Sequence, residues 1–324
     1  MNQRIRILAT LSCIALCPAS VQAQVYPSKP ITIVVAFPAG GAADVIARAV
    51  AQRLIEMWGR PVVIENRAGA NGQIGTAYVA RSAADGYTLL ATPDLTFVAD
   101  PYLYRTLPYD PARDFDPISG LGVINQALVV HPSTPLRNVR DLIVLAKVQR
   151  GGLNYGSWGV GSASRLSMEL LQAMTGVKLS AVQYKGAGPA LTDVIAGHIP
   201  TMFVSVGLMV QPWKAGQLRP LGIGSSERLV ELPELPTIAE TVPGFRATYW
   251  FGVVGPARTP KSTVHKINAA VQNVLEDRDF QERFLAPNFY EPMIGSPEQF
   301  ALTIRSDTEK WRKIIQNAKL TSDE

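Results

Sequence analysis

The chain has 324 residues, of which 47% are hydrophobic and 18% charged, so it can bury a large core and is neither disordered nor collagen-like. Because one domain usually takes about 100–200 residues, this length predicts two lobes or one large α/β unit. The formal net charge is only +5 and the basic residues are not clustered, which argues against a nucleic acid partner.

The first 23 residues have the pattern of a secretory signal peptide. Two arginines precede a short apolar run over 7–17, and Val21-Gln22-Ala23 places a small residue just before Gln24. The apolar run is shorter than the about 20 residues that span a bilayer, so we expect cleavage after Ala23 and no membrane anchor. Both cysteines lie in this leader, which excludes thiol catalysis and cysteine-based metal sites in the mature chain. We therefore expect the mature chain to be exported and not embedded in the membrane.

Strands and helices alternate from the start of the mature chain. The β-branched run 31–37 is typical of a buried parallel strand, and apolar residues at helical spacing follow over 42–57. Further strands are predicted at 61–65 and 87–91, with a glycine-rich turn over 67–72 and a short helix ending at Val79 between them. This βαβαβ order indicates an α/β fold with a parallel sheet.

After a proline-rich, irregular stretch over 101–117, the alternation starts again. Strands are predicted at 127–131, 153–156, 179–183, 201–204 and 219–223, with helices at 139–147, 162–174 and 189–196. A strand at 248–254 and helices at 260–275 and 297–317 complete the chain. Two similar α/β units imply two lobes with a cleft between them.

Two glycine-containing turns join a strand to a helix at corresponding places in the two units. They are Phe37-Pro38-Ala39-Gly40-Gly41 and Ser157-Trp158-Gly159-Val160-Gly161-Ser162. Glycine lets a ligand approach the backbone closely, and a helix N-terminus offers free N–H groups and a partial positive charge. Facing each other, the turns would hold a carboxylate without any arginine, although either turn alone could be an ordinary tight connection.

The sequence lacks the motifs of common enzyme classes. It has no phosphate-binding loop, no dinucleotide-binding glycine pattern and no nucleophile elbow. His131, His198 and His265 are isolated from one another, so the sequence predicts neither a metal site nor histidine-based catalysis. We expect a binding protein that is not an enzyme and uses no cofactor.

Ordered strings of residues run through almost the whole mature chain. They include YPSKPI at 26–31, PVVIENR at 61–67, DGYTLL at 85–90, LPYD at 107–110, PALTD at 189–193 and LPTIAE at 235–240. Together with the two glycine turns they resemble the Bug receptors, the periplasmic solute-binding proteins of tripartite tricarboxylate transporters. The resemblance implies a periplasmic-binding-protein-like α/β clamp with its ligand cleft between two lobes. Residues 24–124 and 244–324 would form one lobe, and 125–243 the other.

The function implied by this resemblance is capture of a small carboxylate or related metabolite and its delivery to membrane transporter subunits. A monomer is expected. An alternative is a ligand-sensing receptor of the same shape that signals to a two-component sensor and transports nothing. Both functions need only a closing cleft and a partner surface, so the sequence does not separate them.

By position, the resemblance assigns ligand binding to residues from both lobes. They are Phe37, Ala39, Gly40, Gly41 and Thr92 in the first lobe, and Ser157, Gly161, Ser162, Ala163, Tyr184 and Lys185 in the second. Asp44 is expected to support the first helix turn, because a carboxylate there favours the helix dipole.

Three positions depart from the family pattern. Arg165 stands where a histidine is usual, Val204-Ser205 where Asp-Asn is common, and Pro93-Asp94 where small residues are common. We expect Asp94 either to line the ligand site or to cap a helix. Val204 and Ser205 are expected to line the site from the second lobe, where Val204 would make one wall apolar. Arg165 would either turn inward or be solvated. With Asp94 on the wall, a ligand with one carboxylate and either a donor group or an apolar body is favoured.

Overall fold

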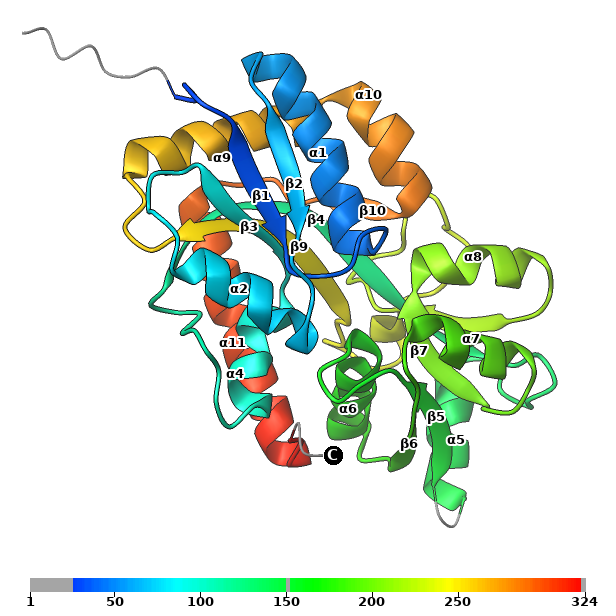
Figure 1. Cartoon of the computed structure of the whole chain (residues 1–324). Helices are drawn as coiled ribbons and strands as arrows, with labels where there is room; N and C mark the ends of the chain where they lie inside the picture. Colours follow the sequence, from blue (N-terminus) through cyan, green and yellow to red (C-terminus); the bar gives the residue numbers. More distant parts are fainter. Residues whose placement is uncertain (1–25, 150–151, 322–324) are drawn as a thin grey trace, which may run out of the picture.

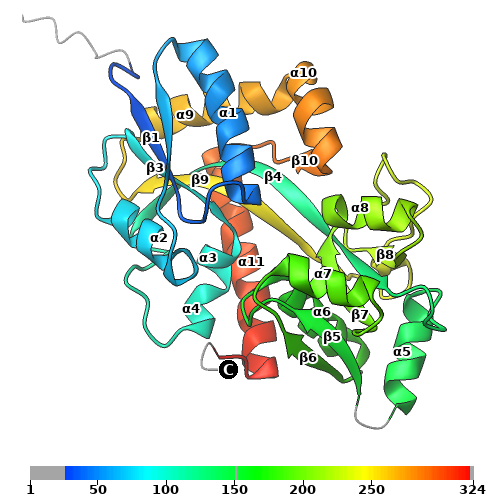
Figure 2. The same cartoon turned by 45° about the vertical axis from the view of Figure 1, so that its right-hand side comes forward.

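The two lobes share one long strand. The structure, a computed structural model, describes residues 26–149 and 152–321. Strand β4 (Phe115–Val130) pairs over residues 115–125 with β9 (Thr248–Pro256) in the first lobe. Over residues 126–130 the same strand pairs with β7 (Thr201–Ser205) in the second lobe (Figures 1 and 2). The predicted two-lobed α/β architecture is therefore confirmed.

The first lobe is a sheet covered by helices on both faces. Its strand order is β2-β1-β3-β9-β4, with β10 on β4, and β1 pairs in parallel with β2 and β3. The elements are β1 (Ile31–Val35), β2 (Val62–Asn66), β3 (Thr88–Pro93), β10 (Tyr290–Pro292), α1 (Ala42–Trp58), α2 (Gln73–Ala80), α3 (Leu95–Val98), α4 (Asp100–Leu103), α9 (Lys261–Glu276), α10 (Arg278–Phe280) and α11 (Pro297–Ala318). Ile33 of β1 packs in the core under α1 and α9, whereas Val34 packs in the core on the opposite face with α2 and α11. Burial on both faces explains why this strand reads as continuously apolar.

The second lobe repeats this layering on a smaller scale. Its elements are α5 (Val139–Val148), β5 (Leu153–Ser157), α6 (Ala163–Thr175), β6 (Leu179–Gln183), α7 (Ala187–Ile195), α8 (Val206–Lys214) and β8 (Arg219–Ile223). Val129 of β4 packs with α7 and α8, and Val130 packs on the other face with α5 and α6. Alternation along one strand thus contributes to both cores of this lobe.

The crossing between the lobes is a small hydrogen-bonded junction. The N–H of Gln126 donates to the carbonyl of Ala247 (3.1 Å), Gly224 donates to Gln126 (2.7 Å), and Ala247 donates to Gly224 (2.9 Å). The domain boundaries predicted after residues 124 and 243 stay a prediction.

Helix α11 touches both lobes. It contacts α3 and α4 in the first lobe and α6 in the second, and Figure 2 shows its C-terminal half beside α6. Trp311 and Ile315 of α11 belong to the same buried cluster as Leu166 and Leu170 of α6. Over the described ranges, no helix combines the length and hydrophobicity that crossing a bilayer requires. The predicted signal peptide lies outside these ranges.

The structure differs from the predicted elements in several places. Helix α8 was missed, because Gly207 and an internal Pro212 lower its helical signal. Strand β4 begins twelve residues earlier than predicted, since Pro117, Gly120 and Gly122 break its pattern at two register shifts. The stretch predicted to be irregular contains most of the short helix α4.

Candidate functional site

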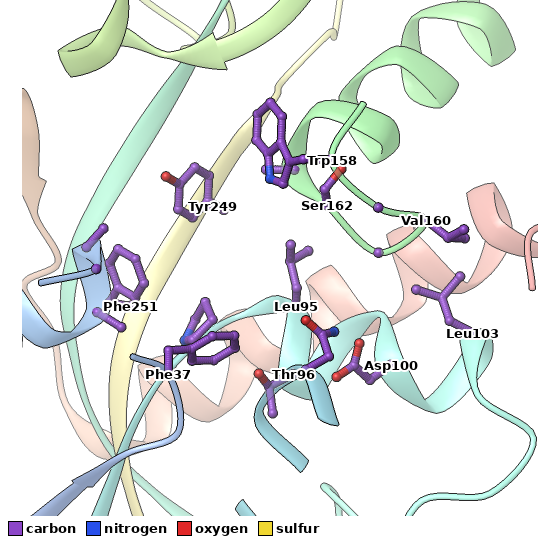
Figure 3. Close-up of a pocket in the computed structure, with 18 of the residues that line it drawn as sticks. Phe37, Leu95, Thr96, Asp100, Leu103, Trp158, Val160, Ser162, Tyr249 and Phe251 are labelled. Atoms are coloured by element: carbon purple, nitrogen blue, oxygen red, sulfur yellow. The ribbon is translucent and has the colours of Figure 1, made fainter. Parts of the chain in front are cut away.

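A cavity of about 660 Å³ lies between the two lobes (Figure 3). The first lobe contributes Phe37, Pro38, Gly41, Ala42, Ala43, Asn71, Pro93, Leu95, Thr96, Asp100, Leu103, Tyr104, Tyr249 and Phe251, and the second contributes residues 158–163. Both glycine turns predicted from the sequence therefore reach one cavity. Its size is in the usual range for a small-molecule site.

The first turn is held in shape by a buried carboxylate. Asp44 accepts hydrogen bonds from the Gly40 N–H (2.9 Å), Arg48 Nε (2.9 Å) and Asn66 Nδ2 (2.8 Å). Gly40 has φ 80°, which a glycine adopts without strain. The bond from Arg48 lowers the pKa of Asp44 to about 2, against burial that raises it. Asp44, in the first turn of α1, thus holds the loop that leads into this helix, and its carboxylate occupies the Gly40 N–H.

Free N–H groups remain at the start of both long helices that face the cavity. In α1 the first intrahelical bond runs from the Val45 N–H to Gly41, so the N–H groups of Ala42 and Ala43 have no acceptor within the helix. In α6 the first such bond runs from the Leu166 N–H to Ser162, so the Ala163 N–H also has no acceptor within its helix. All three alanines line the cavity. Two helix N-termini therefore present donors to one space.

The remaining lining is mostly apolar. Phe37, Trp158, Tyr249 and Phe251 contribute aromatic rings to the lining, and Leu95 lies below Trp158 in Figure 3. Among the described lining residues there is no lysine, arginine or histidine, and the one carboxyl group is that of Asp100. The cavity can hold one anionic group at the helix N-termini and an apolar body against the rings.

Five of the predicted residues line the cavity: Phe37, Gly41, Gly161, Ser162 and Ala163. Ser162 also caps α6, because its Oγ accepts the Arg165 N–H at 3.2 Å.

Four other predicted residues do not line the cavity: three of them lie on the two turns, and Thr92 lies in β3. Ala39 and Gly40 are exposed on the first turn. Ser157 is buried and its hydroxyl donates to the Gly159 carbonyl at 3.3 Å, so it shapes the second turn from within. Thr92 is buried and donates to Thr96 Oγ1 at 3.0 Å.

The rest of the predicted set is distributed elsewhere in the second lobe. Tyr184 donates to Asp193 at 2.7 Å, and Lys185 is exposed. Val204 is fully buried in the core with α7 and α8, and Ser205 is the N-cap residue of α8. None of the four is among the residues that line the cavity.

Asp94 is buried and is not among the residues that line the cavity, in contrast to the expectation that it lines the wall. Pro93 pairs with Phe251 across β3 and β9, and both line the cavity, whereas the Asp94 N–H bonds to the Trp250 carbonyl. Trp250 donates its indole N–H to Asp307 of α11 at 2.9 Å. Burial and Asp307 raise the pKa of Asp94 well above its usual range. Asp94 therefore belongs to the packing against α11.

Arg165 is neither solvated nor in the cavity. Its Nε lies 2.9 Å from Glu169 one turn along α6, and the Tyr155 hydroxyl also donates to Glu169 at 3.3 Å. Burial raises the pKa of Glu169 while Arg165 opposes that rise. The helical spacing of this pair was visible in the sequence, but its partial burial was not.

Several lining residues were not predicted. Tyr249 and Phe251 alternate on β9 and so share one face, a pattern visible in the sequence, but only the fold shows which face meets the cleft. Leu95, Thr96 and Asp100 come from short helices in a region with little periodicity.

The fold and this cavity define a two-lobed solute-binding protein. Residues 46–320 match the family described as "Tripartite tricarboxylate transporter family receptor", and the chain belongs to this family. The resemblance to the Bug receptors is confirmed by these comparisons.

Curated relatives cover the chain almost end to end. A protein from the tcbD-tcbE intergenic region of a Pseudomonas strain is 37% identical over 99% of this chain and 96% of its own length. Protein BugT of Bordetella pertussis is 33% identical over 98% of this chain and 97% of its own.

Solved structures agree with the fold. An adipate-bound protein from R. palustris has a TM-score of 0.80 and 35% identity, over 91% of this chain and 99% of that one. MatC from Rhodopseudomonas palustris, with bound malate, has a TM-score of 0.76 and 29% identity, over 90% of this chain and 100% of that one.

Proposed function

We propose that this chain is a periplasmic receptor that captures a small organic carboxylate between its lobes and delivers it to a tripartite tricarboxylate-type membrane transporter. The observation that carries the proposal is the cavity itself, where the first turns of α1 and α6 present N–H groups without intrahelical acceptors. The carboxylates bound by the two R. palustris relatives support the same ligand class.

The lining favours a ligand with an apolar body. Aromatic rings from both lobes surround the space, and no basic side chain among the described lining residues would pair with a second carboxylate. We therefore place one carboxylate at the N–H groups of Ala42, Ala43 and Ala163, and the carbon skeleton against Phe37, Trp158 and Phe251. Ser162 adds a hydroxyl beside the carboxylate.

Proline substitutions at the first residue of each helix test this site directly. Ala42→Pro and Ala163→Pro each delete one N–H, and proline is favoured at a first helical position. The preceding residues, Gly41 (ψ 163°) and Ser162 (ψ 151°), already have the extended backbone that a following proline requires. The fold should therefore tolerate both changes.

A bound carboxylate should lose about 1.5–3 kcal/mol per deleted hydrogen bond, or roughly 10–150-fold in Kd, by isothermal titration calorimetry. Lys261→Pro is the matched control, because it changes the exposed first residue of α9, outside the cavity lining. The ligand is first found by thermal shift with a panel of aliphatic and aromatic carboxylates. Unchanged affinity in both cavity variants would refute this site.

Export is part of the proposal. We expect the mature protein to begin at Gln24 in the periplasm, and N-terminal sequencing of the periplasmic fraction measures this. Retention of Met1 in that fraction would contradict cleavage of the leader.

A further inference from the structure

One carboxyl group of the cavity lining has no hydrogen-bond partner. Asp100 begins α4, and its side chain lines the cavity although the residue is only 1% exposed. Neither of its carboxylate oxygens finds a partner among the described residues. Figure 3 shows the group at the cavity, near Thr96 and on the opposite side from Phe251. Buried carboxylates normally have hydrogen bonds, so this acceptor calls for an explanation.

Both lobes meet at Asp100. A Cβ added at Gly161 of the second lobe would lie 3.7 Å from Asp100 Oδ1 and 2.9 Å from Leu103 Cδ1. A side chain at position 161 would therefore crowd Leu103 and lie beside the carboxyl group, both of whose oxygens are almost fully buried. Burial, with no opposing charge, raises the pKa of Asp100 to about 7, and the neighbouring carboxyl contributes to the raised pKa of Tyr104. A donor that entered the cavity would meet an unsatisfied acceptor.

We propose that Asp100 is a specificity-determining residue that accepts a hydrogen bond from a hydroxyl or ammonium group on the bound carboxylate ligand and disfavours a ligand with a second carboxylate. This inference rests on the proposed function, because the free N–H groups of α1 and α6 must hold the first carboxylate. A site built to pair with a donor discriminates strongly, since a ligand without that donor leaves a buried acceptor unpaired. A second carboxylate would add repulsion between like charges.

The test compares ligands that differ only in the group distal to the carboxylate. One set is hexanoate, 6-hydroxyhexanoate, 6-aminohexanoate and adipate. The other is benzoate, 4-hydroxybenzoate, 4-(aminomethyl)benzoate and terephthalate. Affinities are measured by calorimetry at about pH 8 for the parent protein, Asp100→Asn and Asp94→Asn. Asp94→Asn is the matched control, because Asp94 is an equally buried carboxyl outside the cavity lining.

In at least one set, the parent protein should bind the hydroxyl or ammonium ligand about tenfold or more tightly than the dicarboxylate. The Asp100→Asn substitution should reduce the ratio of these two affinities about tenfold. The better of the two donor ligands identifies the recognised group. Asp94→Asn should leave the ratio unchanged.

Three outcomes would overturn the inference. The first is an affinity ratio between donor ligand and dicarboxylate that does not change in Asp100→Asn, and the second is an equal change of this ratio in Asp94→Asn. The third is a parent protein that prefers the dicarboxylate and an Asp100→Asn variant that has lost this preference, which would mean that Asp100 is protonated and donates a hydrogen bond. In each of these three outcomes the parent protein still binds a carboxylate, so the proposed receptor function is not contradicted. If no ligand of either set binds the parent protein, the carboxylate receptor function itself fails.

Discussion

Asp44→Asn is expected to destabilise the protein in a strongly pH-dependent way. The substitution keeps the shape of the side chain but removes the charge that accepts from Arg48, Asn66 and the Gly40 N–H. The side chain is only 4% exposed, so solvent screens these bonds weakly. Folding lowers the pKa of Asp44 from 3.8 to about 2, which corresponds to about 2 kcal/mol of stabilisation by the ionised form.

The pH window follows from the direction of that shift. The native protein holds this proton less tightly than the unfolded chain, so the stabilisation is complete above about pH 4 and is lost as the pH falls toward 2. Thermal unfolding of parent and variant from pH 7 to pH 2.5 should show a difference of roughly 4 °C at pH 7 that shrinks through the acid range. Glu56→Gln, at an exposed site on the same helix, should change stability by less than about 1 kcal/mol. A difference for Asp44→Asn that does not vary with pH would refute the reasoning.

Two further predictions concern the second turn and the motion of the lobes. Ser162→Ala should cost about 1 kcal/mol of unfolding free energy in urea denaturation, because the serine caps α6; no loss would mean that the cap is dispensable. Saturating ligand should reduce the radius of gyration in small-angle scattering, because the lobes are joined by β4 and the junction of Gln126, Gly224 and Ala247 and can close by hinge bending. Superimposable scattering curves would indicate a rigid cleft.

Local patterns predicted the fold well where one residue run determines one element. The run at β1 is buried on both faces, so its apolar character is unbroken. Helix α1 is flanked by Gly41 and Gly59, and its apolar face repeats at helical spacing. The start of β4 could not be predicted in this way, because it depends on pairing with distant strands. Strand β4 contains a proline and glycines that are unfavourable in an isolated strand, and pairing with β9 and β10 compensates for them.

Part of the candidate site could likewise be predicted from local sequence, and part depends on the fold. Its two turns were predictable because glycine, a preceding strand and a following helix are all local features. Asp100, Tyr249 and Phe251 come from distant segments and converge only through the order of the strands and the position of α4. Asp94, in contrast, was predicted to line the site and does not. It directly follows Pro93, which lines the cavity, yet it is itself buried outside the lining, where β3 gives way to α3.

The placement of Asp94 is open to a direct test. Its carboxyl group is buried and has no hydrogen-bonding side chain, with Asp307 nearby and Lys310 partly compensating. Because folding raises its pKa, the native state binds this proton more tightly than the unfolded chain, and the group destabilises the protein at neutral pH but not near pH 4. Asp94→Asn should therefore raise the melting temperature at pH 8, and the gain should vanish as the pH approaches 4. Ligand affinity should stay unchanged, since Asp94 is not among the residues that line the cavity. If Asp94→Asn changes the ligand affinity but has the melting temperature of the parent at every pH, the placement is wrong and Asp94 lines the cavity.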